Sequence, residues 1–410
     1  MDNIAGPPVE GKNFFGRKAE TTSLWKTLQN HDVLLLGPRR IGKTSVAREL
    51  MRVAEGNGWH VMEVNIASCA SEQAFVEKLV KCLEAHQKSW AGQVLARIGS
   101  RLSELLQRLK GVKVGMPGSG SIALDLSTTQ CEDWTELASD ILRLMSDVRE
   151  RWLIYIDELP VFLFSLIAND PATGITRTRR FLDWFRNDVR AISECSQVRW
   201  LVTGSVGLDT LVQRHRMAAT LNSMRHETLA PFTDSVAEHM VRELAVSYQV
   251  TMSADETTSF VRAIRWPQPY YVQLVFHFLR QLIQATGKPP RELIAEAIEC
   301  TVQPEADNDF HHWEERLTTQ LGKVDAYRAV ALLTLAAQKQ EGAQPETLLA
   351  ELQRYMSDYT ADEQREKFIE LRDILQRDAY WWPDESGGQQ RRYRFRLELL
   401  RLWWVRRRKL

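Results

Sequence analysis

A glycine-rich segment near the start of the chain has the residue types and spacing of a phosphate-binding loop. Gly37, Gly42, Lys43 and Thr44 occupy the fixed positions of G-x-x-x-x-G-K-[ST]. Glycines there let backbone N–H groups turn towards phosphate oxygens. Lys43 would reach the terminal phosphates of a nucleotide, and the Thr44 hydroxyl would complete a Mg²⁺ shell. The other candidate nucleotide contacts of this segment are Pro38, Arg39, Arg40, Ile41 and Ser45.

Two adjacent carboxylates, Asp157 and Glu158, follow the apolar run Leu153–Ile156. Asp157 would hold Mg²⁺, and Glu158, pointing to the other side of the chain, would polarise an attacking water. The alternative is an ordinary acidic pair at a helix N-terminus, stabilised by the helix dipole. The glycine loop favours the catalytic interpretation, because two neighbouring carboxylates are costly without a cation nearby.

A third candidate position lies at the end of the run Val198–Thr203, which is followed by Gly204 and Ser205. In a parallel sheet the carboxyl ends of the strands face the ligand crevice. Ser205 or Thr203 would then lie near the γ-phosphate or the attacking water. An ordinary strand-to-helix turn with Ser205 as its cap explains the same residues equally well.

The apolar pattern around these residues predicts strands that alternate with helices. The expected strands are Val33–Leu36, His60–Ile66, Trp152–Ile156, Val198–Thr203 and His226–Leu229. Helical spacing lies between them, which predicts an α/β fold with a parallel sheet covered on both faces. Residues 88–130 form an insertion with a helical part and a glycine-punctuated part that predicts a projecting hairpin.

From residue 234 onward the spacing is almost wholly helical. Near the end, two short aromatic runs flank the turn-like PDESGGQQ, which predicts a two-stranded wing behind three helices. The predicted organisation is therefore a core over residues 1–232, a helical lid over 233–305, and a helical region with a winged helix over 306–410.

Composition excludes several classes of protein. The chain has 410 residues, 53 basic and 53 acidic, so no global charge draws it to nucleic acid or membrane. Its five cysteines are scattered without a CxxC pair, which argues against a zinc site or disulfide framework and predicts a reducing, cytoplasmic location. No apolar run is long enough to span a bilayer, and the first residues do not form a signal peptide.

These motifs resemble the P-loop ATPases of the prokaryotic AAA+/STAND group, and within it the archaeal-type and origin-recognition-like ATPases. The resemblance covers about residues 12–285 and rests on LLLGPRRIGKTSVAREL, LIYIDELPVFL, VTGSVGL, LAPFTDSVAEHM and PQPYYVQLVFHFL. It is specific for the superfamily and not for a biological role. It implies ATP as the nucleotide, and the chain contains no N-K-x-D or T-K-x-D guanine-reading motif.

The resemblance also implies roles for further residues. Phe15, Gly16 and Arg17 resemble the segment beside the adenine, Ser205 the sensor of the fourth strand, and Pro269 the lid proline that contacts the base. The glycine that the family has before this proline is replaced within Trp266-Pro267-Gln268, which puts the lid contact in doubt. Candidates for an arginine that acts in a neighbouring subunit, each otherwise a surface arginine, are Arg179, Arg180, Arg214 and Arg216.

The last twenty residues hold nine basic residues and one acidic residue, a local charge of +8. Basic and aromatic residues interleaved in residues 391–410 suit duplex DNA contacts beside a wing. A terminal helix that packs its leucines and tryptophans on the bundle explains the same pattern, and a membrane-surface helix is a third interpretation. His311, His312 and Glu315 are typical of a solvated helix start and not of a metal site.

Together these features predict a Mg²⁺-dependent ATPase in which Lys43, Thr44, Asp157 and Glu158 act on ATP, and a C-terminal winged helix responds. The module would act on DNA or on a DNA-bound partner, and a protein partner or homo-oligomer stays open. The alternative is a signalling or scaffold protein with slow or no turnover, whose winged helix binds other proteins.

Overall fold

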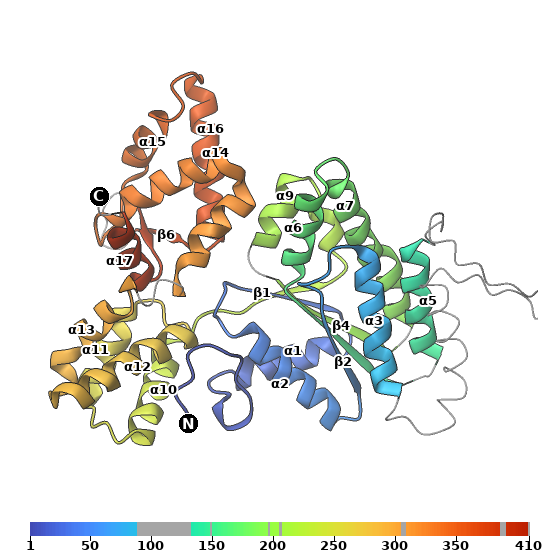
Figure 1. Cartoon of the computed structure of the whole chain (residues 1–410), viewed down its shortest axis with the longest axis horizontal. Helices are drawn as coiled ribbons and strands as arrows, with labels where there is room; N and C mark the ends of the chain where they lie inside the picture. The colour runs from blue at the N-terminus through green and yellow to red at the C-terminus, as the bar shows by residue number, and fades with distance from the viewer. Residues whose placement is uncertain are drawn as a thin grey trace, which may run out of the picture.

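A computed structural model describes residues 1–87, 133–147, 150–195, 197–204, 207–304, 309–385 and 391–408. Within these ranges an α/β core, a helical lid and a C-terminal module follow one another along the chain (Figure 1). The predicted hairpin insertion of residues 88–130 lies outside the described residues, and so does Ser205.

The core is built on a five-stranded parallel sheet with the order β2-β3-β4-β1-β5. Leu36 pairs with both Gly204 and Thr228, and Asn65 pairs with Asp157, so the carboxyl ends of the strands meet at one edge. The strands are β1 (Val33–Leu36), β2 (His60–Asn65), β3 (Trp152–Asp157), β4 (Val198–Gly204) and β5 (Arg225–Thr228). The predicted strands are confirmed to within one residue at each end.

Both faces of the sheet are covered, because successive side chains point to opposite sides of a strand. Val33 and Leu35 pack with one layer of helices, whereas Leu34 and Leu36 pack with the other. The first layer holds α1 (Lys18–Leu28) and α2 (Lys43–Gly56). The second holds α3 (Glu72–Gln87), α5 (Trp134–Asp147), α6 (Leu159–Asn169), α7 (Gly174–Trp184) and α9 (Gly207–Arg214).

The chain between α7 and β4 continues as a π-helical turn, η2 (Phe185–Val189), and α8 (Arg190–Cys195). The sequence pattern predicts a single helix over residues 175–194, because periodicity does not reveal a π-helical turn. The helices α1 and α5 were not predicted either. In α1 only Leu24, Trp25 and Leu28 are large and apolar, so its sequence shows little helical periodicity.

The lid consists of four helices whose starts are marked in the sequence. Ser253 caps its helix in a capping box with Glu256, Thr233 caps with its hydroxyl, and prolines occupy the first helical position of the other two. These helices are α10 (Asp234–Ser247), α11 (Ala254–Ile264), α12 (Pro269–Thr286) and α13 (Pro290–Cys300).

The C-terminal module has the order of elements that the sequence predicts for a winged helix. A β-bridge between Ala343 and Tyr393 and the antiparallel strands β6 and β7 form its small sheet. Its elements are α14 (His311–Ala337), α15 (Pro345–Gln353), α16 (Ala361–Arg377), β6 (Trp381–Asp384), β7 (Arg392–Phe395) and α17 (Glu398–Arg407). The apolar spacing predicts two separate helices here, over residues 308–321 and 325–338, and Gly322 breaks α14 between them with φ 73° and ψ 169°.

One continuous apolar cluster joins the lid to the C-terminal module, from Phe232 through Tyr271 and Trp313 to Trp404. The two clusters of the core lie on either side of its sheet. The predicted domain boundaries stay predictions, and that at residue 305 falls outside the described ranges. None of the described helices is both long and apolar enough to cross a bilayer.

Candidate functional site

The glycine loop connects the end of β1 to the start of α2. Gly37 and Gly42 have φ values of 155° and 97°, and Arg40 also has a positive φ, of 69°. Such backbone is accessible to glycine at little cost, and it turns N–H groups away from ordinary strand or helix pairing. Gly42 caps α2 without a side-chain hydrogen bond, so the N–H groups and positive dipole of this helix face the loop.

Lys43 closes the loop on itself. Its Nζ donates to the main-chain oxygens of Gly37 at 2.9 Å and Pro38 at 3.0 Å. Desolvation lowers the pKa of Lys43 to about 8, while the charges of Glu158 and Asp157 act in the opposite direction. The ammonium group is therefore held at the centre of the loop, next to the carboxylates of β3.

Asp157 is fixed by hydroxyl groups on both of its oxygens. Thr44 Oγ1 donates to Oδ2 at 3.3 Å, and Thr203 Oγ1 donates to Oδ1 at 2.5 Å. Thr44 lies in the first turn of α2 and Thr203 near the end of β4, so three neighbouring elements meet at this carboxylate. Tyr155 lies on the same face of β3, and burial together with the charge of Asp157 raises the pKa of its phenol.

Glu158 stands directly before α6, in the turn that follows β3. Its backbone is left-handed, with φ 53° and ψ 47°, and its N–H donates to Thr203 Oγ1 at 3.1 Å. A residue other than glycine adopts this conformation at a cost of about 1–2 kcal/mol. The exposed carboxylate lines the same cavity as Lys43. The Thr203 hydroxyl therefore fixes both acidic residues, because it binds the carboxylate of Asp157 and the backbone N–H of Glu158.

Phe15, Gly16 and Arg17 join the glycine loop to the lid. Arg17 is 3% exposed, and its guanidinium donates to the carbonyl oxygens of Ile41 at 3.2 Å and Ala230 at 2.8 Å. A Cβ atom on Gly16 would lie 2.7 Å from Val236 of α10. The structure thus places this segment between the loop and the first lid helix.

Two further predicted residues lie at the same junction. Ser45 Oγ accepts the N–H of Val9 at 3.0 Å, so the N-terminal segment crosses the start of α2. Pro269 is the first residue of α12, and the next residue, Tyr270, lies under the guanidinium of Arg40 with 4.1 Å between Cζ and the ring centroid. Arg40 also pairs with Asp309 at 3.1 Å, which links the loop to the start of the C-terminal module.

Comparison with known proteins adds the fold family. No family model and no curated protein matches the chain. The solved Walker-type ATPase of Pyrococcus abyssi superposes with a TM-score of 0.61 at 13% identity, over 98% of this chain and 99% of its own. The chain has the AAA+ P-loop ATPase fold. This confirms the predicted α/β fold with a parallel sheet.

Two other solved structures match the chain at lower scores. The ORC2 protein of Aeropyrum pernix, in ADPNP and ADP complexes, has a TM-score of 0.45 at 11% identity, over 97% of both chains. The RuvB Holliday junction branch migration motor of Thermotoga maritima has a TM-score of 0.40 at 12% identity, over 93% of this chain and 92% of its own.

The first half of α14 brings residues to the P-loop that sequence reasoning missed. A cavity of about 420 Å³ is lined by Lys43 and Glu158 from the core and by His312 and Arg316 from α14. Both ring nitrogens of His312 are buried without a hydrogen-bond partner. The available signal was the spacing of four between His312, Arg316 and Gln320, which puts three polar side chains on one face of the helix.

The four arginines considered for a role in a neighbouring subunit do not lie together in this cavity. Arg179 donates to the carbonyl of His215, Arg180 pairs with Asp133, and Arg214 donates to the carbonyl of Gln320 at 2.7 Å. Arg216 is exposed, with a positive φ of 54°. Their assignment stays a prediction.

The basic tail is packed into the C-terminal module. Trp403 and Trp404 are at most 2% exposed. Six arginines among the described residues 391–408 bind within the protein: Arg391, Arg394, Arg401, Arg407 and Arg408 pair with carboxylates, and Arg396 donates to the carbonyl of Trp381. The packing interpretation therefore accounts for most of this composition.

Proposed function

We propose that this chain binds ATP with Mg²⁺, hydrolyses it, and uses the nucleotide state to reposition its C-terminal module. The observation that carries the proposal is the arrangement of Asp157 between Thr44 and Thr203, with Lys43 and Glu158 lining one cavity. The similarity to a solved Walker-type ATPase supports it at the level of the fold.

The residues at this position fit a magnesium ion. Mg²⁺ prefers oxygen ligands and in nucleotide sites takes one or two protein groups together with phosphates and waters. Thr44 Oγ1 and the Asp157 carboxylate are 3.3 Å apart and supply such oxygens. When bound, the ion would neutralise phosphate charge. No larger acidic cage is needed.

The remaining residues have separate roles in this proposal. The loop amides and Lys43 bind and orient the phosphates, in line with the dipole of α2. Glu158 accepts a hydrogen bond from the attacking water and withdraws its proton. Phe15, Gly16, Arg17 and Pro269, whose places between the loop and the lid suit a base-binding segment, line the adenine side.

The module would act on a protein partner more readily than on DNA. The third helix of the module, α16, carries five acidic and four basic residues, so its net charge does not attract a duplex. The basic tail, which suggested DNA, is mostly occupied by internal ion pairs. Action on DNA is the second candidate, and it requires a basic surface elsewhere.

Steady-state phosphate release tests the proposal, with Glu158→Gln as the main variant. The wild-type chain should hydrolyse ATP in a Mg²⁺-dependent manner, and Glu158→Gln should bind ATP with little change in affinity while turnover falls at least about 100-fold. Glu194→Gln on α8 is a matched control that should retain wild-type turnover. Lys43→Ala should lose nucleotide binding.

Two results would decide against hydrolysis. Tight nucleotide binding by the wild-type chain without turnover would favour the signalling or scaffold alternative. Failure to bind ATP at all would overturn the proposal. Repeating the assay with duplex DNA separates the two classes of partner, because DNA-stimulated turnover would contradict the protein-partner assignment.

A further inference from the structure

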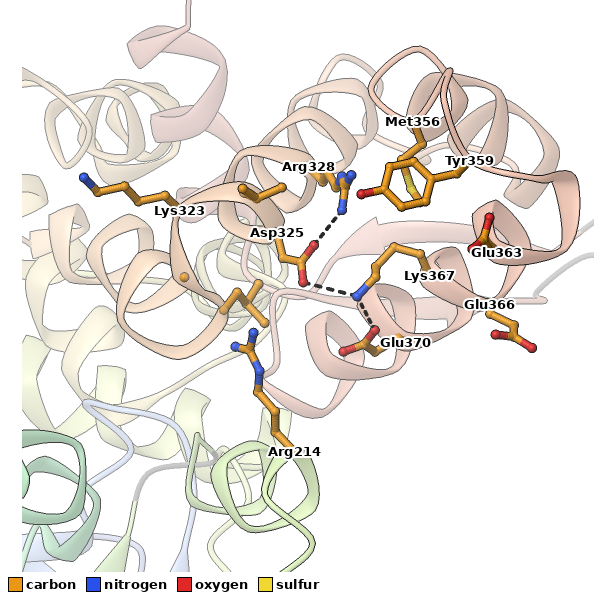
Figure 2. Close-up of a pocket in the computed structure, with 13 residues that line it drawn as sticks. Arg214, Lys323, Asp325, Arg328, Met356, Tyr359, Glu363, Glu366, Lys367 and Glu370 are labelled. Carbon is orange, nitrogen blue, oxygen red and sulfur yellow. Dashed lines mark hydrogen bonds and ion pairs between the residues drawn. The ribbon is translucent and has the colours of Figure 1, made fainter. Parts of the chain in front are cut away.

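The C-terminal module exposes large apolar side chains around one cavity. This cavity, of about 670 Å³, is lined by the second half of α14, the connection from α15 to α16 and the first turns of α16, with Arg214 of α9 at its rim (Figure 2). Val324 and Tyr359 line it and are 65% and 46% exposed. Tyr327 is 64% exposed, and its ring meets that of Tyr355 edge-on. The lining residues and Tyr327 form the α14–α16 face, and exposed side chains of this size that gather in one place mark an interaction surface.

The middle of the α14–α16 face is an ion-pair network that is neutral overall. Asp325 pairs with Arg328 at 3.0 Å and with Lys367 at 3.2 Å, and Lys367 also pairs with Glu370 at 2.6 Å (Figure 2). Arg328 lies over the ring of Tyr359, with 5.3 Å from Cζ to the centroid. The network therefore joins α14 to α16 and to the connection before it, so the face is held in one shape before any partner binds.

The remaining charges of the face are segregated to its two ends. Lys323 and Arg214 lie on one side of the network, and Glu363 and Glu366 lie on the other (Figure 2). All four side chains are exposed, and Arg214 donates to the uncharged carbonyl of Gln320. Within the part of the chain that the structure describes, none of the four forms an ion pair. The face thus has a cationic end and an acidic end, separated by a neutral centre.

Such a surface is complementary to itself. A two-fold rotation about an axis through the neutral centre exchanges the two ends, so the cationic end of one copy meets the acidic end of the other, and this contact forms twice. The same rotation brings the exposed tyrosines and Val324 of both copies to one interface. Removal of their apolar surface from water stabilises the contact.

The balance of charge favours a second copy over other partners. The cavity is lined by four basic and four acidic side chains, so its net charge is zero. A duplex, or a peptide of one sign of charge, would place like charges together at one end of the face. A second copy meets opposite charge at both ends.

The position of the face in the molecule allows this contact. The end of the module that carries the connection from α15 to α16 projects away from the lid and the core (Figure 1). Glu363 and Glu366 lie in the first turns of α16, next to this connection. A projecting end can reach the cationic end of a second copy while the two cores stay apart.

We propose that two copies of this chain associate through the α14–α16 face about a two-fold axis. Glu366 of each copy lies against Lys323 of the other, and Tyr327 is buried in both. The inference goes beyond the proposed function, because the face contains no residue of the P-loop and the contact does not depend on hydrolysis. It names a second copy as the protein partner of the module.

Sedimentation velocity of the full chain tests the association. The wild-type chain should change from monomer to dimer between about 1 and 200 µM, the range expected for a polar interface of modest size. Tyr327→Ser should raise the dissociation constant about 10- to 100-fold, because each dimer loses the ring twice. Val246→Ser in the lid, where the side chain is 78% exposed, is the matched control and should leave the dissociation constant unchanged.

Reversed charges test the two-fold arrangement. Lys323→Glu and Glu366→Lys should each raise the dissociation constant at least about 10-fold, because either homodimer then contains two contacts between like charges. An equimolar mixture of the two variants should dimerise with about the wild-type affinity, since the reversed charge of one chain faces the reversed charge of the other. Glu296→Lys on α13 makes the same charge change outside the face and should have no effect.

Three outcomes would overturn the inference. The first is a wild-type chain that stays monomeric up to about 200 µM, beyond the range in which such interfaces associate. The second is a dimer that Tyr327→Ser does not weaken, and the third is a mixture of the two charge variants that stays monomeric. Because nucleotide binding and turnover are measured separately, a monomeric chain that hydrolyses ATP would remove this contact alone. A dimer that binds no ATP would remove only the proposed function.

Discussion

Asp157 illustrates how a carboxylate can be prepared for a metal ion by its neighbours. Two threonine hydroxyl groups, from the start of α2 and from β4, donate to its two oxygens. A ligand that is oriented in advance does not have to be ordered when the ion arrives. Thr203 contributes most to this arrangement, since it also accepts the N–H of Glu158.

Thr203→Val should separate nucleotide binding from hydrolysis. Valine keeps the β-branched shape in this fully buried position and removes the hydrogen bonds of the hydroxyl with Asp157, with the Glu158 N–H and with the Ile156 carbonyl. Loss of such a supporting contact lowers activity by about 10- to 100-fold, so kcat should fall by this factor while the ADP affinity changes little. Steady-state turnover and calorimetric ADP binding measure the two effects.

The control for this variant is Thr257→Val, an equally buried threonine in α11 of the lid whose hydroxyl donates to the carbonyl of Ser253. It should lower stability slightly and leave kcat near the wild-type value. Equal losses of kcat in both variants would show that Thr203 acts only through general stability.

Individual site residues differed in how far the sequence could predict them. Lys43, Thr44, Asp157 and Glu158 lie in continuous motifs, and the structure brings them together. Ser205 and the base contact of Pro269 stay predictions. His312 was interpreted as part of a solvated helix start, because nothing local shows that α14 will lie against a loop about 270 residues earlier.

Strand β1 depends on one buried acid. Asp32, directly before the strand, is 7% exposed, and its Oδ1 accepts the N–H of Trp200 in the neighbouring β4 at 2.9 Å. Burial raises the pKa of Asp32 to about 6, although the Trp200 N–H and Arg199 oppose the shift. The strand that carries the P-loop is therefore anchored by a carboxyl group that titrates near neutral pH.

The stability of the core should therefore depend on pH through Asp32. The pKa of Asp32 in the folded protein lies above its value in the unfolded chain, which is near 3.9. Protonated Asp32 therefore contributes fully to the free energy of unfolding below pH 4, and this contribution is lost as the pH rises through 6. The side chain of Asp32→Asn stays neutral. The free energy of unfolding of this variant, relative to that of the wild type, should therefore rise by up to roughly 3 kcal/mol between pH 4 and pH 7.5. Urea denaturation at both pH values measures this difference.

An exposed acid provides the comparison for this prediction. Asp362→Asn at the start of α16 should show a difference from wild type that hardly changes over the same pH interval. If Asp32→Asn also shows no change with pH, the carboxyl group is not desolvated in the way that its position indicates.

The elements themselves were largely predictable because their patterns are local. The alternation of Val33, Leu34, Leu35 and Leu36 between two apolar layers follows from strand geometry. The order of the strands does not, because pairing β1 between β4 and β5 depends on contacts nearly 170 residues or more apart in the chain. The division of α14 at Gly322 was visible, but its consequence for the P-loop was not.

At the scale of the whole molecule, charge is distributed so that the basic tail is neutralised locally. Glu314 in the first half of α14 binds both Arg407 and Arg408, and Glu398 binds Arg401. These pairs connect the last helix to the helix that faces the P-loop. The tail therefore contributes to the shape of the module, and its formal charge of +8 overstates the positive field that an outside partner would meet.

Duplex DNA binding should consequently show a weak dependence on salt. Release of counter-ions gives a slope of log K against log salt of about −0.9 for each phosphate contacted, so eight free arginines would give a slope near −7. With most of these arginines paired, we expect a slope shallower than about −2 and less than a twofold effect of reversing the exposed charge in Arg406→Glu. Fluorescence anisotropy with a labelled duplex, at salt concentrations from 50 to 200 mM, measures both.

Arg365→Glu on the acidic surface of α16 serves as the control, because it makes the same charge change outside the tail. A slope steeper than about −5 that is reduced by Arg406→Glu but not by Arg365→Glu would show that the ion pairs open and that the tail binds DNA.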